Sequence, residues 1–500
     1  MSLIFVVFAG AKGFYGPVSE MHGFRQAQTA ISASYILKGG PWLAYETPVL
    51  GPPWSIPFEF PLYQWAVALA AKAGLFPLVQ SGRLVSILFF LSSLVPLYGI
   101  LRLLKLGKDQ ALAVLSLYCV SPQYLFWSRT LMIESTVLAL ALYYIWFVML
   151  YSEGRASSSG KWALLILSAA FGALAGMVKV TTFGAFWAAA LMVLGIRILS
   201  DLRDGHAFLR NWRLLLFGAV VPVIAVYIWT SYADWNKALN PFGSHLTSSA
   251  LKAWNFGTLK QRLSVGTYGT FCVRDLTNIM GSYLLIVPAV LAGLFCGRER
   301  RKAVLMLLVL FALPFFIFTN LYFVHDYYSY ANGIFLLAAI GVACAGLMES
   351  GGRLKLISGA VLFSMIYVSS VYHYAAKYWP VQGTGYSYSD MKADFGAYTR
   401  ADDVIIAFGA DWSSEAPFYL ERRGLMMAEW MRRRNPGLGF RYISQNLSGY
   451  RTGAVLFCAK TRDDTSFQKE TLSGLGLDRY KKIVEYERCK VYYMSGPDGA

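Results

Sequence analysis

The feature that most limits how this chain can fold is a series of long apolar runs. Residues 84–104, 133–151, 162–178, 181–199 and 214–233 carry very few charged side chains. Each run approaches the roughly 20 residues that an α-helix needs to cross a bilayer. None shows the alternating ten-residue pattern of a transmembrane β-barrel. The sequence therefore predicts a polytopic α-helical membrane protein.

Composition supports this prediction and explains the positive charge. The chain is 56% hydrophobic and 15% charged, whereas soluble domains contain roughly 45–50% apolar residues. The net charge is +17. In a soluble protein this charge would suggest nucleic acid, but Lys and Arg retained in cytoplasmic loops explain it better here. We therefore expect the lipid bilayer as a partner and no nucleic acid.

The positions of basic loops predict the topology. If residues 62–78 form an interfacial helix, about eleven spans place every basic loop on the cytoplasmic side. The N-terminus is then cytoplasmic and the C-terminus is outside. These basic loops are Arg102–Lys108, Arg155–Lys161, Arg203–Arg213, Arg298–Lys302 and Arg353–Lys355. The expected spans are 2–15, 84–104, 110–126, 133–151, 162–178, 181–199, 214–233, 279–297, 303–323, 330–349 and 354–374.

The same count of spans places the polar segments together on the opposite side of the membrane. Ionisable residues near the ends of membrane helices indicate a functional site by default. Their common side therefore suggests a single site at the outer face. The segments are Glu20–Glu59, Ser128–Glu134, Lys179–Thr182, the loop 234–278 and His325–Tyr328.

The composition changes near residue 378. Charged residues become frequent there, and strands are expected at 404–408, 455–458 and 490–494. We expect a transmembrane domain over 1–377, with periplasmic loops 16–80 and 234–278, and an extracytoplasmic α/β domain over 378–500. Cys458 and Cys489 lie in two of the expected strands and could form a disulfide outside the cytoplasm. Sequence cannot fix the geometry that a disulfide needs, so their pairing stays open.

Residues 18–30 hold a compact group of polar side chains after an apolar opening. Glu20, His22, Arg25 and Gln26 lie within seven positions of one another, and residues 25–38 follow as an expected amphipathic helix. A carboxylate, an imidazole and a guanidinium this close can serve acid–base chemistry and anion binding. The alternative is a solvated loop that leads into a surface helix.

Here the chain resembles a known family. The stretch 18–30 resembles the Asp/Glu-x-His-x-Trp-Arg-Gln-Ala-Asp-Thr-Ala motif of bacterial polyprenyl-phosphate-sugar-dependent glycosyltransferases. These are GT-C class membrane enzymes, relatives of protein O-mannosyltransferases and lipid A aminoarabinose transferase. Gln28 stands where the family usually has Asp, so a second carboxylate is missing. Weaker resemblances lie at Pro57–Tyr63, Ser128–Glu134, His325–Tyr328 and Leu420–Gly424.

The resemblance implies a hexosyl- or pentosyltransferase of the bacterial inner membrane. It would transfer a sugar from a polyprenyl-phosphate carrier to a glycan, lipid or protein acceptor at the periplasmic face, with inversion. Glu20 is the expected base that deprotonates the acceptor hydroxyl, and Glu59 is the second candidate. No organic cofactor is implied, and a role for a divalent metal is left open.

The remaining candidates would stabilise the departing phosphate or hold the sugar. Each has a structural alternative. Arg25 could pair with Glu20, Arg129 could pair with a supporting Glu134, and Lys179 could reach lipid headgroups. His325 and Tyr328 could belong to an interfacial aromatic belt. The candidates are His22, Arg25, Gln26, Arg129, Lys179, His325 and Tyr328.

The main alternative function is a transporter or flippase of a lipid-linked sugar. Such proteins place ionisable residues near the bilayer midplane, in broken helices of two matching halves. In this sequence the charges gather at one face and no halves match. The interpretation as a glycosyltransferase is therefore preferred.

Overall fold

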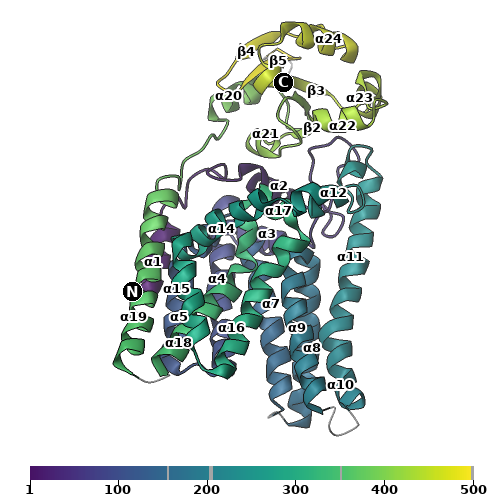
Figure 1. Ribbon diagram of the computed structural model, residues 1–500. Helices are drawn as coiled ribbons and strands as arrows, with labels where there is room; N and C mark the ends of the chain where they lie inside the picture. The colour runs from purple at the N-terminus through teal and green to yellow at the C-terminus, as the bar shows by residue number, and fades with distance from the viewer. Residues whose placement is uncertain (155–156, 202–206, 350–351, 497–500) are drawn as a thin grey trace. The chain divides into compact units, whose positions relative to one another are not determined.

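The computed structural model describes residues 1–154, 157–201, 207–349 and 352–496 (Figure 1). Two compact units form, and each is discontinuous in sequence. The helical unit contains Met1–Phe14, Arg83–Thr230 and Lys252–Gln382, and the sheet unit contains Tyr15–Gly82, Ser231–Leu251 and Gly383–Ala500. Arg155 and Arg203, from two of the expected basic loops, lie outside the described residues.

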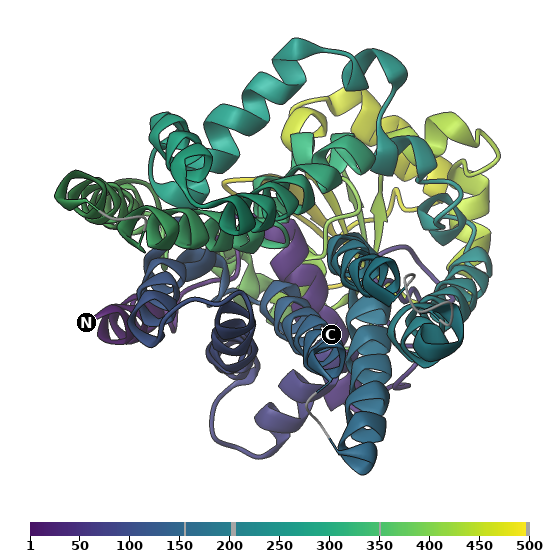
Figure 2. The same ribbon diagram turned by 60° about the horizontal axis from the view of Figure 1, so that its bottom comes forward.

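Long helices make up most of the helical unit and run side by side in Figures 1 and 2. Helix α7 packs against α8 and α9, and α18 packs against α15, α16 and α19. All the main helices except α4 and α11 lie wholly in the helical unit, and one end of each of these two belongs to the sheet unit. The main helices are α1 (Ser2–Ala11), α4 (Leu78–Leu103), α5 (Lys108–Val120), α6 (Pro122–Trp127), α7 (Glu134–Glu153), α8 (Ser158–Val178), α9 (Val180–Asp201), α11 (Val221–Ala238), α14 (Val265–Met280), α15 (Ile286–Phe295), α16 (Arg298–Ile317), α17 (Thr319–Val324), α18 (Gly333–Glu349) and α19 (Arg353–His373).

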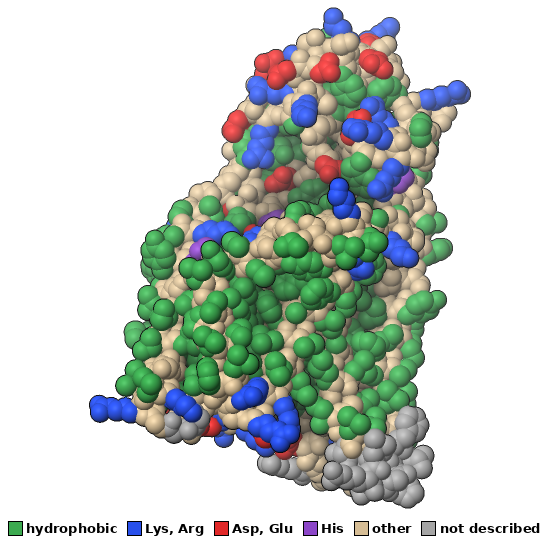
Figure 3. Space-filling model, viewed as in Figure 1, with side chains coloured by type: hydrophobic (Ala, Val, Ile, Leu, Met, Phe, Trp, Pro, Cys, Tyr) green, Lys and Arg blue, Asp and Glu red, His purple; other side chains and the backbone are tan. Residues whose placement is uncertain are grey.

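Six of the described helices are long and apolar enough to cross a membrane, or seven if a bent pair counts as one span. The bent pair is 265–280 with 283–295, and its two parts differ in direction by 90°. The expected count of about eleven therefore stays a prediction. Hydrophobic side chains cover the visible face of the helices in Figure 3. On α19, Leu354, Val361 and Val368 are all at least half exposed, which suits a lipid-facing surface.

Three of the expected basic loops meet at one end of the helical unit. Arg300 of α16 forms an ion pair with Glu349 at the end of α18 and donates to the Lys105 carbonyl. Gln110 of α5 also donates to Glu349, at 2.9 Å. Lys and Arg side chains gather at the lower ends of the helices in Figure 3. Because α19 begins shortly after Glu349, the loops near residues 105, 300 and 353 share one end of the helical unit. The predicted topology also requires these loops to lie on one side.

A five-stranded sheet forms the centre of the sheet unit, with strand order β2-β1-β3-β5-β4. Strands β1, β2 and β3 are parallel, and β5 and β4 are antiparallel additions. The three expected strands are confirmed as β1, β3 and β5, while β2 and β4 were not expected. The bounds are β1 (Val404–Phe408), β2 (Arg423–Met427), β3 (Thr452–Cys458), β4 (Lys482–Glu485) and β5 (Cys489–Tyr493).

A disulfide joins the central strand β3 to its antiparallel neighbour β5. Cys458 and Cys489 are bonded, and they are directly opposite each other in the β3–β5 register. The pairing that the sequence left open is therefore formed. Helices α20 (Ser389–Tyr398), α21 (Glu415–Tyr419) and α24 (Thr465–Leu475) belong to the same unit.

The free edge of β2 is covered by a loop from far earlier in the chain. Gly424 N–H donates to the Pro48 carbonyl at 2.9 Å, and Met426 N–H donates to Val49 at 2.8 Å. Asn240, from the short segment 231–251, donates its amide to the Gly51 carbonyl at 2.8 Å. Capping an edge in this way prevents unwanted strand pairing. These bonds explain why three distant segments form one compact unit.

Candidate active site

The motif at 18–30 forms the start of helix α2 (Gly23–Leu37), which confirms the expected helix. His22 precedes the helix in a left-handed conformation, with φ 46°. Gln26 donates from Nε2 to the Met21 carbonyl at 2.8 Å, and Arg25 donates from Nη1 to Gln28 Oε1. Gln28, which replaces the family's Asp, thus engages the guanidinium through a neutral oxygen. The turn before α2 is held by its own polar side chains.

Glu20 is a buried carboxylate beside this turn. Its side chain is 8% exposed, and Oε2 accepts a hydrogen bond from the Gly383 backbone N–H at 2.8 Å. Gly383 begins the C-terminal part of the sheet unit. A backbone donor of this kind fixes the orientation of the carboxylate. Glu20 is thus held in one orientation by the unit that contains it.

Glu59 lies on the loop before helix α3 (Leu62–Lys72), and it is also buried. Its Oε1 accepts from the neutral amide Gln64 Nε2 at 3.0 Å. The Tyr45 hydroxyl fixes this part of the loop, since it donates to the Glu59 carbonyl at 3.0 Å and accepts from Phe58 N–H at 2.8 Å. Burial, and secondarily the Glu59 charge, raises the pKa of the Tyr45 hydroxyl well above its usual range. Tyr45 therefore stays a neutral donor beside this carboxylate.

Lys179 and Glu134 form a buried ion pair within the helical unit. Lys179 stands in extended conformation, φ −159° and ψ 97°, at the break between α8 and α9. Its Nζ lies 2.6 and 2.7 Å from the two carboxylate oxygens of Glu134, the first residue of α7. Among the described residues, the ion-pair partner of Glu134 is therefore Lys179. The sequence suggested Arg129 as the partner of Glu134 and gave no sign that the break between α8 and α9 brings Lys179 to this carboxylate.

Aromatic rings enclose the Lys179 ammonium. Its Nζ lies 4.0 Å from the centroid of the Tyr328 ring and 5.3 Å from that of Tyr327. The His325 ring stacks on Tyr328 with centroids 5.5 Å apart and an interplanar angle of 22°. Cation–π contact and burial hold the ammonium inside the unit, so Lys179 does not extend to lipid headgroups. Lys179, His325 and Tyr328 are thus brought together.

Arg129 follows helix α6 and is 1% exposed. Its guanidinium carbon lies 5.6 Å from the Phe126 ring centroid. A guanidinium cannot lose its charge in proteins and must be balanced wherever it is buried. Arg129 and Lys179 are thus two buried cations of the helical unit.

Sequence reasoning missed a second polar group in the helical unit. Arg274 and Asp275 of α14 form an ion pair, and Asp275 is completely buried. Nearby on the same helix, Asn278 Oδ1 accepts from Lys377 Nζ at 2.9 Å. These residues were overlooked because 234–278 was treated as a loop. The signal that could have revealed them is the apolar spacing of Val265–Met280 around a single Arg-Asp pair.

The candidate residues divide between the two units. One group lies on helix α2, the turn before it and the loop before α3, and α2 and α3 pack against each other. The other group lies in the helical unit. Within the described ranges, no group of three or more His, Cys, Asp or Glu side chains could hold a metal ion. The sheet unit holds Glu20, His22, Arg25, Gln26 and Glu59, and the helical unit holds Arg129, Glu134, Lys179, His325 and Tyr328.

Several solved structures share this arrangement of helices and sheet. ArnT from Cupriavidus metallidurans bound to undecaprenyl phosphate matches 98% of this chain and 97% of its own, with a TM-score of 0.62 and 12% identity. The Archaeoglobus fulgidus oligosaccharyltransferase matches 100% of this chain and 74% of its own, with a TM-score of 0.56 and 10% identity. The arabinofuranosyltransferase AftD from Mycobacteria matches 99% of this chain and 40% of its own, with a TM-score of 0.55 and 14% identity.

These three neighbours are GT-C glycosyltransferases. The fold of this chain is the GT-C fold. No protein-family model and no curated protein sequence matches the chain. The GT-C assignment therefore rests on three-dimensional structure, which agrees with the family that the 18–30 motif resembles.

Proposed function

We propose that this protein is an integral membrane glycosyltransferase. It transfers a sugar from a polyprenyl-phosphate donor to a glycan, lipid or protein acceptor, with inversion at the anomeric carbon. The observation that carries this proposal is the GT-C fold over 98% of the chain, combined with a buried carboxylate in the motif at 18–30. The sugar transferred is a hexose or a pentose.

The chemistry needs a base and a site for the leaving group. An acceptor hydroxyl loses its proton to a positioned carboxylate as it attacks the anomeric carbon. The bond between that carbon and the phosphate oxygen breaks, and the phosphate leaves with its negative charge. A single direct displacement of this kind inverts the anomeric centre. We assign the base to Glu20, which is buried and oriented by the Gly383 N–H, and acceptor or sugar hydroxyl contacts to Glu59.

The leaving phosphate needs positive charge or hydrogen-bond donors. Arg129, Lys179, His325 and Tyr328 supply these in the helical unit, with Glu134 holding Lys179 until the anion arrives. His22, Arg25 and Gln26 are proposed to contact the donor from α2. The neighbour bound to undecaprenyl phosphate, and an archaeal oligosaccharyltransferase in complex with a dolichol-phosphate, support a polyprenyl-phosphate donor for this chain.

We further propose that the sheet unit faces the periplasm and that the protein lies in a bacterial inner membrane. The Cys458–Cys489 disulfide supports this, since disulfides persist outside the cytoplasm. Single cysteines test it in a Cys272→Ser background, which removes the exposed free thiol. Arg301→Cys should be labelled by an impermeant maleimide only from the cytoplasmic side, and Glu429→Cys only from outside. Labelling of both from one side would contradict the topology.

Reconstituted protein separates transfer from transport. In liposomes with a polyprenyl-phosphate-linked sugar, the protein should move the sugar to an acceptor, and free undecaprenyl phosphate should inhibit that transfer. A transporter or flippase would instead carry the intact lipid-linked sugar between leaflets without releasing the phosphate carrier. Flipping without sugar transfer would overturn the proposed function.

A further inference from the structure

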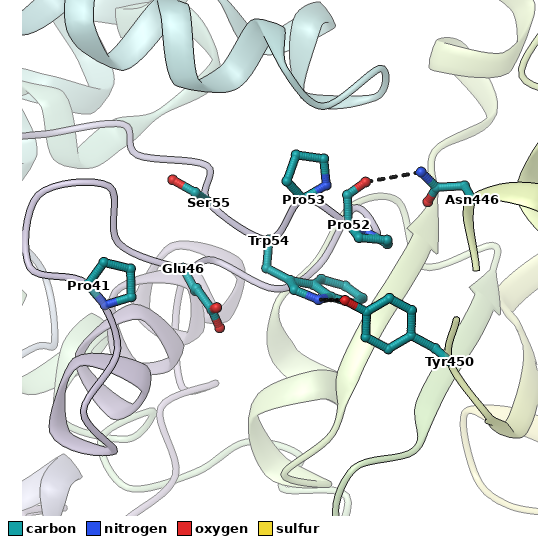
Figure 4. Close-up of a pocket in the computed structure, with 8 residues that line it drawn as sticks. All are labelled: Pro41, Glu46, Pro52, Pro53, Trp54, Ser55, Asn446 and Tyr450. Carbon is teal, nitrogen blue, oxygen red and sulfur yellow. Dashed lines mark hydrogen bonds between the residues drawn. The ribbon is translucent and has the colours of Figure 1, made fainter. Parts of the chain in front are cut away.

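A pocket lies inside the sheet unit, between the loop 39–61 and the C-terminal strands (Figure 4). Its volume is about 620 Å³, within the roughly 300–1,000 Å³ of small-molecule sites. Trp54 and Tyr450 form one wall, with ring centroids 5.4 Å apart and Trp54 Nε1 donating to the Tyr450 hydroxyl at 3.0 Å. None of the candidate donor or base residues lines it. The lining residues are Pro41, Glu46, Pro52, Pro53, Trp54, Ser55, Asn446 and Tyr450.

The pocket is lined by flat apolar surfaces. Tyr450 is 36% exposed and presents an aromatic face, and prolines 41, 52 and 53 add rigid apolar rings. Aromatic and proline rings pack well against the C–H face of a pyranose or furanose. Such walls suit a ligand with one apolar face and a polar rim.

The polar groups of the pocket lack hydrogen-bond donors. The Ser55 hydroxyl and the Asn446 amide oxygen are buried without a hydrogen-bond partner in the described part of the chain. Glu46 is bonded through Oε2 by Arg423, at 2.7 Å, which leaves Oε1 for another donor. Unmet buried acceptors favour a ligand that brings hydroxyl hydrogens. Sugar hydroxyls provide these, whereas proline-rich peptides bring few donors.

Charge and backbone pairing exclude two other classes of ligand. The Glu46–Arg423 ion pair makes the lining close to neutral, so neither an anion nor a cation is favoured. An extended peptide cannot add to the adjacent β2 edge, because residues 48–51 already occupy it through the bonds to Gly424 and Met426. A neutral, hydroxyl-rich ligand remains.

We infer that this pocket binds a neutral sugar unit of the acceptor. The inference rests on the proposed glycosyltransferase function and adds to it the chemical class of the acceptor: a glycan, or a glycosylated lipid or protein. The pocket acts as a binding subsite for a sugar that is not itself modified. Tyr450 stacks on the sugar ring, and Glu46, Ser55 and Asn446 accept from its hydroxyls.

The test uses the full-length protein in lipid nanodiscs on an array of neutral glycans, anionic glycans and proline-rich peptides. Neutral glycans should be retained. For the best of them, Tyr450→Ala should raise Kd about tenfold, since one aromatic stacking contact is lost. Tyr450→Phe, which keeps the ring, should bind within about threefold of wild type. Glu46→Gln should raise Kd about three- to tenfold by weakening one charge-assisted hydrogen bond.

Tyr480→Ala is the matched control. Tyr480 is an exposed aromatic of the same unit, 39% exposed and outside the pocket, so its removal should leave glycan binding unchanged. Retention of only anionic glycans or only proline-rich peptides would overturn the inference. So would retention of no neutral glycan, or unchanged Kd in Tyr450→Ala and Glu46→Gln. Undecaprenyl phosphate binding, measured on the same samples, separates this failure from failure of the proposed function.

Discussion

The two units hold their buried carboxylates through different contacts. In the helical unit, both oxygens of Glu134 lie within 2.7 Å of the Lys179 ammonium. In the sheet unit, Glu59 accepts from the neutral Gln64 amide and Glu20 accepts from the Gly383 backbone. The ammonium fixes Glu134 to Lys179, whereas hydrogen bonds from an amide and a backbone N–H orient Glu59 and Glu20. Glu134 is therefore given a positioning role, and the base is assigned to Glu20 of the 18–30 motif, with Glu59 as the second candidate.

The largest expected effect comes from breaking the pair in the helical unit. Glu134→Gln leaves the Lys179 ammonium buried without its partner, and such a loss costs about 3–5 kcal/mol. Thermal unfolding in detergent should show a correspondingly lower Tm. The double variant Glu134→Gln with Lys179→Met should recover most of the loss, because no lone charge remains. A single variant as stable as wild type would contradict the structural role of the pair.

The second effect separates donor from acceptor binding. Arg129→Ala removes a buried guanidinium proposed to contact the carrier phosphate, a contact worth about 1.5–3 kcal/mol. The Kd for undecaprenyl phosphate should rise about 10- to 100-fold, while the acceptor KM changes little. Arg129→Lys keeps the charge and should recover part of the affinity. Unchanged donor binding in a folded Arg129→Ala protein would assign this residue to structure alone.

Glu59→Gln compares the two carboxylates of the sheet unit. If Glu59 holds a hydroxyl, the neutral amide keeps part of that contact, and turnover should fall by about tenfold or less. The steady-state kcat of Glu59→Gln and of Glu20→Gln, measured side by side, checks the ranking. A greater loss in Glu59→Gln would transfer the base to Glu59 and leave the motif at 18–30 with a structural role.

The smallest effect concerns Glu415, a carboxyl of the sheet unit that lies against Gly23 at the start of α2. Burial raises the pKa of Glu415, and Arg488 offsets part of this. Because the folded pKa is the higher one, the protonated form favours folding, and stability falls as pH rises from about 4.5 through the folded pKa. Glu415→Gln should therefore raise Tm by ~1–3 °C at pH 7.5 and have no such benefit at pH 4. An equal shift at both pH values would contradict this.

Local patterns predicted much of the fold. The run Val404–Phe408 is buried along its whole length and forms β1 as expected, and α2 follows the polar motif as its periodicity indicates. These features depend on neighbours in sequence, so the sequence shows them directly. The membrane character likewise follows from runs that only a bilayer can accommodate.

Long-range pairings could not be predicted. Glu134 and Lys179 are 45 residues apart, and Glu46 and Arg423 are 377 apart. Arg129 was an equally reasonable partner for Glu134, since nothing local distinguishes two cations. The pairing of residues 48–51 with β2 is also invisible in local periodicity, because it depends on two backbone edges meeting. For this reason, the assembly of the sheet unit from three separate segments could not be predicted.

Single-turnover transfer by Glu20→Gln measures how much the proposed base contributes to the reaction. The substitution keeps the shape of residue 20 and one acceptor oxygen, and it removes the ability to take a proton. With donor and acceptor saturating, the account predicts a rate about 10²–10⁴ times lower than wild type. The Kd for undecaprenyl phosphate should stay within about twofold, because Glu20 does not neutralise the phosphate. A near-normal rate with intact donor binding would contradict the account.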